Sequence, residues 1–273
     1  MTGVPDEARA LASDADHRLA AELAEQSAAL LRALRASGSD DPDVLRKEGD
    51  RRSHELLVAE LTTRRPADAV LSEEGTAGTA PERLGVRRVW IIDPLDGTRE
   101  FGEPGRPDWA VHVALVIDGF PVAGAVALPA LGEVWSTASA PVPPDPPSAA
   151  TLPRLAVSRT RPGWSASLVR QALGAELVPL GSAGFKALAV IRGVADIYAH
   201  SGGQYEWDSA APVAVALAHG LHASRLDGTP LAYNNANPYL PDLLIAHPDW
   251  ARPALQAVAG GDPPAGTNPA QGT

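Results

Sequence analysis

The stretch Val89-Trp90-Ile91-Ile92-Asp93-Pro94-Leu95-Asp96-Gly97-Thr98-Arg99-Glu100-Phe101 decides how this chain is interpreted. Its first four residues are apolar, which predicts a buried strand over 89–92 that Pro94 and Gly97 are expected to end. Two carboxylates, Asp93 and Asp96, then leave the end of a rigid element together, an arrangement that suits a hard cation. The Gly-Thr step offers N–H groups and a hydroxyl to a phosphate oxygen. The stretch therefore predicts metal-assisted phosphate chemistry.

An ordinary turn is the competing interpretation of Asp96-Gly97. Asp-Gly is a common turn dipeptide, and the chain repeats it at Asp118-Gly119 and Asp227-Gly228 between apolar runs. We interpret these two repeats as turns. Asp93, the buried strand and Thr98 distinguish the 93–98 segment from them.

Three segments occur in the order typical of one superfamily. Residues 93–98 (Asp-Pro-Leu-Asp-Gly-Thr) resemble the D-P-[IL]-D-G-T signature of the inositol monophosphatase-like, lithium-sensitive phosphatases. Upstream, Leu71-Ser72-Glu73-Glu74-Gly75 resembles their strand-end E-E motif. Downstream, Glu206-Trp207-Asp208-Ser209-Ala210-Ala211-Pro212 resembles their W-D-x-A motif. The resemblance covers roughly residues 45 to 247.

Within that superfamily the chain is most similar to the 3'(2'),5'-bisphosphate nucleotidases of the CysQ type. Residues 96–101 resemble their D-G-T-[KR]-E-F, whereas the inositol branch typically reads D-G-T-x-N-F. The resemblance implies an α/β layered sandwich with two subdomains and the site between them. It implies conversion of 3'-phosphoadenosine 5'-phosphate to AMP, and of the sulfated form to adenylyl sulfate, in sulfate assimilation. Inhibition by Li⁺ is implied as well.

Two other functions stay open. The first is inositol-1-monophosphatase or fructose-1,6-bisphosphatase activity on the same fold. The second, from another class, is a non-catalytic phosphate or nucleotide sensor, against which the intact acidic residues argue.

The resemblance implies that Mg²⁺ is held by Glu73, Asp93, the Leu95 carbonyl, Asp96 and Asp208, as two or three ions with Mn²⁺ as a possible substitute. All these donors are oxygen atoms, which suit such hard cations. Glu74 is expected next to the ligands, since adjacent strand-end residues point in opposite directions. The alternatives are a solvated edge for the acidic pair 73–74 and, for Asp208, a carboxylate that stabilises the start of a helix over 207–219.

By the same resemblance, Asp50 and Thr98 would orient the attacking water. Asp50 ends the segment Arg46-Lys47-Glu48-Gly49-Asp50, which lies where family members carry T-x-A-D. Lys47 departs from the usual Thr or Ser. The alternative for Asp50 is an N-cap before a helix over 51–64.

Substrate contacts follow from two further segments. Ser158-Arg159 resembles a V-S-[RK] segment near the substrate phosphate, and Arg159 suits a bidentate phosphate grip. Residues 181–186 resemble G-S-x-x-x-K, which adds Ser182 and Lys186. The expected substrate-binding set shares the motif positions already described: Glu73, Leu95, Asp96, Gly97, Thr98, Ser158, Arg159, Ser182, Lys186 and Asp208. An ordinary exposed arginine and a simple helix cap are the alternatives. No histidine receives a role.

Composition bounds the remaining choices. The 273 residues contain no cysteine, so disulfides and thiolate metal sites are excluded. The net charge of −10 argues against binding a nucleic acid polymer, and no apolar run is long enough for a membrane span. We expect a cytoplasmic enzyme acting on a small phosphorylated nucleotide or sugar alcohol, with a homodimer plausible.

The chain is expected to form an N-terminal α+β metal-binding domain over 1–140 and a C-terminal α/β domain over 150–258. The proline-rich run 141–147 would be a loop between them, and 259–273 a disordered tail. Periodicity predicts helices over 6–36, 51–64, 165–173, 182–192 and 208–219. It predicts strands near 70, 89–92, 110–117, 122–128, 155–157, 176–178, 195–199, 221 and 243.

Overall fold

The computed structural model describes residues 4–38, 41–75, 81–138 and 152–261, which form two five-stranded mixed sheets. The first sheet has the order β1-β2-β3-β4-β5. Its strands are β1 (Ala69–Ser72), β2 (Arg88–Asp96), β3 (Ala110–Ile117), β4 (Phe120–Leu128) and β5 (Glu133–Ser136). The second sheet has the order β7-β6-β8-β10-β9. Its strands are β6 (Arg154–Ser158), β7 (Glu176–Leu180), β8 (Ile197–Tyr205), β9 (His222–Ser224) and β10 (Tyr239–Ala246).

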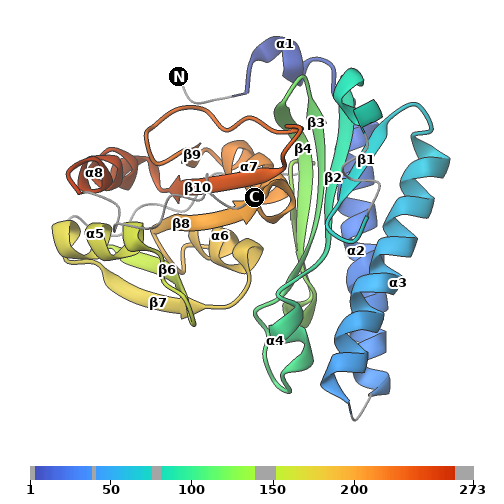
Figure 1. Cartoon of the computed structure of the whole chain (residues 1–273), viewed down its shortest axis with the longest axis horizontal. Coiled ribbons are helices and arrows are strands. Elements are labelled where there is room, and N and C mark those ends of the chain that lie inside the picture. The colour runs from blue at the N-terminus through green and yellow to red at the C-terminus, as the bar shows by residue number, and fades with distance from the viewer. Residues whose placement is uncertain (1–3, 39–40, 76–80, 139–151, 262–273) are drawn as a thin grey trace.

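Helices alternate with the sheets in layers. Figure 1 shows α2 and α3 on the outer face of the first sheet, α6 and α7 between the sheets, and α5 and α8 on the far face of the second. The bounds are α1 (Asp6–Arg9), α2 (Asp14–Ser37), α3 (Pro42–Arg64), α4 (Thr98–Gly102), α5 (Trp164–Leu173), α6 (Ala183–Ile191), α7 (Glu206–Ala218) and α8 (Pro248–Ala259), with short 3₁₀ turns η2 (Pro81–Gly85) and η3 (Pro129–Leu131). Three apolar clusters hold the layers together: one lies between the α2/α3 layer and the first sheet, one surrounds α6 and α7 between the sheets, and one lies between the second sheet and the α5/α8 layer. The expected α/β layered sandwich is confirmed.

The N-terminal helices differ from the prediction. The helix expected over 6–36 is interrupted, because Ser13 accepts from Asp16 in a capping box and starts α2 afresh. The helix expected from about residue 51 begins at Pro42 instead, where the Asp41 side chain caps the first turn. Asp50 therefore lies inside α3, and its interpretation as an N-cap is wrong.

The decisive strand is longer than its apolar core. β2 continues past Ile92 to Asp96, and its pairing with β3 shifts between Asp93 and Asp96. Pro94 lies at this irregularity, where no ladder N–H is required of it. The prediction that Pro94 would end the strand is therefore wrong. Strand β5 and helices α4 and α8 were not predicted.

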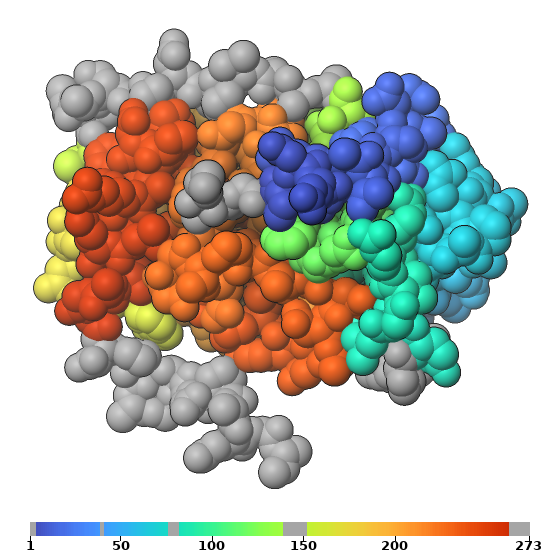
Figure 2. Space-filling model, turned by 90° about the horizontal axis from the view of Figure 1, so that it is seen from above, coloured from blue at the N-terminus to red at the C-terminus, as the bar shows by residue number. Residues whose placement is uncertain are grey.

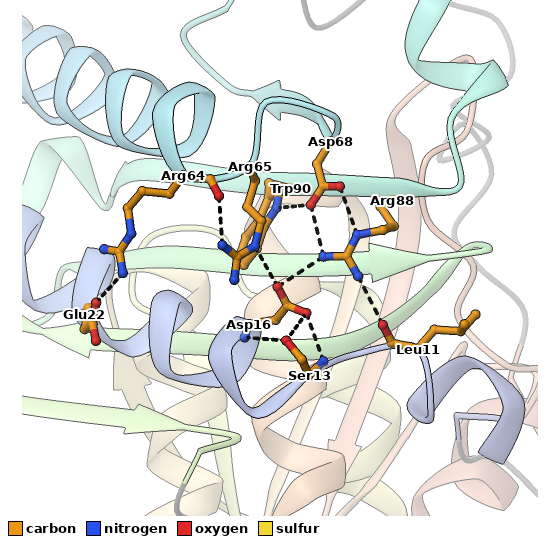
Figure 3. A network of polar contacts seen from close by, with 9 residues as sticks. All are labelled: Leu11, Ser13, Asp16, Glu22, Arg64, Arg65, Asp68, Arg88 and Trp90. Atoms are coloured by element: carbon orange, nitrogen blue, oxygen red, sulfur yellow. Dashed lines mark hydrogen bonds and ion pairs between the residues drawn. The ribbon is translucent and has the colours of Figure 1, made fainter.

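A buried polar network joins the start of α2 to the first sheet (Figure 3). The Asp16 carboxylate accepts from Arg65 Nε at 2.8 Å and from Arg88 at 3.1 Å. Asp68, just before β1, accepts from Arg88 and from Trp90 Nε1, both at 2.9 Å. The network fixes where α2 and α3 sit on the first sheet.

The two halves of the chain also meet near the N-terminus. Val4 shares a small crevice with Phe120 of β4 and Val213 of α7. Figure 2 shows the blue N-terminal segment lying against green strand residues and orange residues of the second half. The division into domains over 1–140 and 150–258 stays a prediction. The run 141–147 lies outside the described residues, as do residues 262–273 of the tail expected over 259–273. Ala259 is the last residue of α8, so the expected tail begins too early there. No helix in the described ranges has the length and apolar character needed to cross a bilayer.

Candidate active site

Three carboxylates predicted as metal ligands converge at one point. One oxygen each from Asp93, Asp96 and Asp208 lies within 4.8 Å of the others. The first two come from the end of β2, and the third from the first turn of α7. Asp208 also accepts from Tyr205 N–H at 2.6 Å. It therefore stabilises the helix start and is a member of the cluster at the same time. The helix-start interpretation and the ligand interpretation of Asp208 are therefore compatible.

Backbone groups hold Asp93 and Asp96 in place. Asp93 accepts from Leu95 N–H at 3.1 Å. Asp96 accepts from Ala183 N–H at 3.1 Å and from Gly184 N–H at 2.6 Å, both at the start of α6. A helix start favours a negative charge, so α6 fixes the orientation of Asp96.

A histidine that received no role in the sequence lies against this cluster. His112 of β3 is fully buried, with Nε2 3.2 Å from Asp96 Oδ2 and Nδ1 2.9 Å from the Trp207 carbonyl oxygen. Both neighbours present acceptor oxygens, which favours an imidazole that carries hydrogen on both ring nitrogens. Burial alone would lower the pKa of His112, but contact with Asp96 raises it. Likewise, burial alone would raise the pKa of Asp96, but the His112 charge lowers it.

The remaining acidic groups are strained electrostatically. Burial, followed by the charge of Glu73, raises the pKa of Asp93 well above its ordinary range. Burial and the charge of Asp96 raise the pKa of Asp208 to about 6. Such shifts arise where carboxylates crowd together without enough positive charge. Oxygen donors gathered in this way fit a hard divalent cation such as Mg²⁺.

Glu73 lies beside the cluster without being part of it. It follows β1, which runs parallel to β2, and although part of the residue is exposed, its carboxyl group lies close to those of Asp93 and Asp208. Burial of its carboxyl group and the charge of Asp208 raise the pKa of Glu73 to about 7. Among the described residues, the tight cluster contains the three aspartates alone. Glu73 as a ligand stays a prediction, and so does the metal role of the Leu95 carbonyl.

The two predicted water-orienting residues lie together. Thr98 Oγ1 is 3.3 Å from Asp50 Oδ1 and 3.1 Å from the Leu95 carbonyl oxygen. Burial and the charge of Glu74 raise the pKa of Asp50 to about 7. Thr98 begins α4 immediately after Gly97, whose φ of 86° is left-handed. A Cβ on Gly97 would stand 2.8 Å from Ser182 Cβ, so only glycine allows this approach.

A cavity of about 830 Å³ opens beside Asp96 and Asp208. This volume lies in the range of small-ligand pockets. Its wall includes Ser158, Arg161, Trp164, Lys186, Gln204 and Tyr205. Thus four of the predicted substrate-binding residues, Asp96, Ser158, Lys186 and Asp208, line one space.

The other predicted substrate contacts are placed differently. Ser182 accepts from Phe185 N–H at 3.0 Å and caps α6, as its alternative interpretation expected. Lys186 Nζ donates to the carbonyls of Gly181 and Ser182, which holds its ammonium at the cavity wall. Burial lowers the pKa of Lys186, although Asp96 opposes this shift.

The placement of Arg159 argues against its predicted role as a phosphate grip. Its guanidinium is 2.7 Å from Glu100 Oε1 and 3.1 Å from Glu103 Oε1, so two carboxylates of the α4 segment already balance its charge. Arg161 lines the cavity instead. Within the described ranges its guanidinium has no hydrogen-bond or ion-pair partner. The substrate role of Arg159 stays a prediction, and the resemblance gave no role to Arg161.

Two further supporting residues were not predicted. Asp108 accepts from Gly181 N–H at 2.6 Å, and its carbonyl accepts from Ser182 N–H at 3.2 Å, which fixes the loop before α6. Gly184 makes room for His112, because a Cβ there would stand 2.0 Å from His112 Nε2. The one available signal was His112 itself, since a histidine inside a continuously apolar strand requires a buried partner.

Known proteins with similar sequences are named as phosphatases of nucleotide bisphosphates. The chain is 52% identical over 237 residues to a 3'-phosphoadenosine 5'-phosphate phosphatase from Mycobacterium tuberculosis, covering 84% of this chain and 88% of that protein. It is 30% identical over 196 residues to the 3'(2'),5'-bisphosphate nucleotidase CysQ from Escherichia coli K12, covering 69% and 79%.

A solved structure and a family profile both match this chain. The crystal structure of CysQ from Bacteroides thetaiotaomicron superposes with a TM-score of 0.74 at 25% identity, covering 87% of this chain and 98% of that one. The sequence profile described as the inositol monophosphatase family matches residues 6–257. The chain therefore belongs to the inositol monophosphatase family.

Proposed function

We propose that the chain is a Mg²⁺-dependent phosphomonoesterase that hydrolyses the 3'-phosphate of 3'-phosphoadenosine 5'-phosphate and releases AMP. One observation carries the proposal: Asp96 and Asp208 of the three-aspartate cluster line a cavity whose wall also carries Lys186 and Arg161. A substrate with one scissile and one remote phosphate matches an acidic metal centre beside separate positive charges. The 52% identical relative supports this choice. The sulfated nucleotide would react in the same way to give adenylyl sulfate.

Asp93, Asp96 and Asp208, with Glu73 and the Leu95 carbonyl, would hold two or three Mg²⁺ ions, or Mn²⁺ in their place. When bound, such ions neutralise the charge on the phosphoryl group and on the attacking and leaving oxygens. The Asp96 carboxylate is held by the His112 ring and by an N–H at the start of α6. The protein thus fixes the ligand oxygens before substrate arrives, so little reorganisation is needed during reaction.

The Asp50–Thr98 pair is positioned to orient the attacking water. With its pKa near 7, Asp50 can accept a hydrogen bond or a proton at neutral pH. The Thr98 hydroxyl donates to the Leu95 carbonyl, which fixes its oxygen as an acceptor for that water. The water oxygen forms the new bond to phosphorus, the bond to the ribose 3'-oxygen breaks, and that oxygen takes up a proton.

Arg161 is the proposed grip for the remote phosphate. It lines the cavity, and no described residue balances its charge. Remote binding energy appears as selectivity between substrates. We therefore expect Arg161→Ala to lower kcat/KM for 3'-phosphoadenosine 5'-phosphate by about 10-fold or more, the effect of losing a charge-assisted contact. Turnover of inositol 1-phosphate, which has no second phosphate, should change much less.

Arg159→Ala is the matched comparison. Because Arg159 is held by Glu100 and Glu103, its removal should affect both substrates to the same extent. Equal losses in Arg161→Ala on the two substrates would remove Arg161 from the proposed role. A substrate-selective loss in Arg159→Ala would restore the expectation drawn from the sequence.

The function as a whole is tested by turnover on a substrate panel. Nucleotide bisphosphates, inositol monophosphates and fructose 1,6-bisphosphate should be compared by kcat/KM in Mg²⁺. Preference for an inositol phosphate would overturn the nucleotidase assignment, and absence of any turnover would favour the sensor. A cytoplasmic location, a homodimer and inhibition by Li⁺ stay predictions.

A further inference from the structure

An exposed aromatic ring stands at the end of β8 with one of its faces covered. Tyr205 is 46% exposed and lines the cavity beside Asp208. Its ring stacks on Trp207, with centroids 4.9 Å apart and an interplanar angle of 10°. Tyr239 contacts it edge-on, at 6.1 Å and 85°. The two neighbours fix the plane of the Tyr205 ring, and no other ring among the described residues stacks on its second face.

The ring is also fixed relative to the acidic cluster. Tyr205 lies three residues before Asp208, and its N–H donates to Asp208 Oδ2 at 2.6 Å. It lines the same cavity as Asp96, Asp208 and Lys186. Since this link to Asp208 runs through the backbone, a change of the side chain leaves it in place.

Two glycines before Tyr205 keep the neighbouring wall flat. Gly202 and Gly203 line the cavity with left-handed φ values of 105° and 88°. A Cβ on Gly203 would stand 2.2 Å from Tyr239 Oη, so glycine lets Tyr239 reach the Tyr205 ring. A Cβ on Gly202 would meet no described atom within 4 Å. The cavity that Tyr205 lines is therefore not narrowed by a side chain at Gly202.

We propose that Tyr205 is a stacking platform for the nucleobase, and that it sets the preference of this site for nucleotides with a purine. The inference rests on the proposed function and adds the residue that recognises the base. A flat, fixed aromatic surface accepts any base through its π-face, and a purine offers more overlap than a pyrimidine. An inositol phosphate offers no such face.

The test compares two substrates that differ only in the base. They are 3'-phosphoadenosine 5'-phosphate and the abasic ribose 3,5-bisphosphate. Tyr205→Ala should lower kcat/KM for the nucleotide by about 10- to 100-fold. Its loss on the abasic substrate should be at least about 10-fold smaller than that. Tyr205→Phe keeps the ring and should stay close to the wild type on both. Leu177→Ala removes another exposed apolar side chain, outside this cavity, and serves as the control.

Binding of the product gives a second readout that does not depend on turnover. Calorimetric affinity for AMP should fall in Tyr205→Ala, and affinity for ribose 5-phosphate should change by a much smaller factor. Equal losses on both members of either pair, or no loss at all, would overturn the platform. Equal losses together with a changed elution volume would assign the aromatic group to a protein interface instead. A wild type that hydrolyses inositol phosphates but no nucleotide would refute the proposed function itself.

Discussion

Asp96 and Asp208 each satisfy a local backbone need and still direct a carboxylate into the shared cluster. Replacing either by asparagine preserves the shape and removes the ligand charge. We expect Asp96→Asn and Asp208→Asn each to lower kcat by at least about 10²-fold while the protein stays folded. Phosphate release and the circular dichroism spectrum measure the two quantities.

The control residues are the aspartates of the other two Asp-Gly turns. Asp118 pairs with Arg87, and Asp227 accepts from Thr229, both away from the cluster. Asp118→Asn and Asp227→Asn should leave phosphate release close to the wild-type rate. If they reduced it as strongly as the cluster variants, the distinction between the turns would fail.

Gly184 tests the support behind Asp96. A methyl group at this position would collide with His112 Nε2 and disturb the hydrogen bond that the Gly184 N–H donates to Asp96. Overpacking of this kind typically costs about 1–3 kcal/mol. Gly184→Ala should therefore lower both the free energy of unfolding and kcat. Gly85→Ala, where a Cβ meets no described atom within 4 Å, should change neither. Wild-type values for Gly184→Ala would show that His112 can move without loss.

At this scale, sequence could locate the residues whose spacing is itself the signal. Asp93 and Asp96 follow an apolar run, so their position at the end of one strand could be predicted. The partners of Asp96 come from β3 and α6, far along the chain, and no local pattern joins them. Arg159 shows the same limit, because its ion pairs with Glu100 and Glu103 depend on how two distant segments meet.

Among the elements, the start of α2 depends on a buried charge, that of Asp16 (Figure 3). Although burial alone would raise the pKa of Asp16, the Ser13 N–H and the Arg65 side chain lower it to about 2. Because the pKa of Asp16 is lower in the folded state, its ionised carboxylate stabilises the fold at pH values above the unfolded-state pKa of 3.8. This contribution is lost as the pH falls through about 2. The shift corresponds to roughly 1–2 kcal/mol after allowance for solvent screening.

Asp16→Asn should therefore unfold at lower urea concentration than the wild type at pH 6. The difference in unfolding free energy should shrink as the pH is lowered from 5 toward 2. Asp14→Asn, in the same helical turn but outside the network, is the comparison. A difference that stayed constant with pH would mean that Asp16 stabilises α2 through its shape and not through its charge.

Element boundaries show what periodicity can and cannot predict. Strands β3 and β4 and helices α5 and α6 were expected within a few residues of their bounds, because turns or glycines bracket clear patterns. The start of α3 was missed because Val44 and Leu45 are adjacent and the charged residues after them give its first two turns no apolar period. β5 was missed because four residues are too few for an alternation to stand out.

For the whole molecule, α7 is the element that brings the halves together. It packs on β2, β3 and β4 of the first sheet, on β8, β9 and β10 of the second, and on α6, and it carries Asp208. The acidic cluster is therefore completed only when both sheets are in place. The order of the motifs indicated one site, but the layering that closes it arises from long-range contacts that local patterns do not encode.

This arrangement predicts that the metal stabilises the entire fold. An ion held by Asp93 and Asp96 of β2 and Asp208 of α7 would bind the folded state alone, because unfolding separates these residues. At 100 times its dissociation constant, such a ligand adds about 2.7 kcal/mol, which would raise Tm by about 5 °C or more. Mg²⁺ should produce this rise in the wild type, and excess chelator should abolish both the rise and phosphate release. In Asp208→Asn the repulsion between carboxylates is relieved, so the metal-free protein should melt at or above the wild-type Tm and respond little to Mg²⁺. Undiminished phosphate release in chelator, or an equal Mg²⁺ response in Asp208→Asn, would contradict a metal centre shared between the two halves.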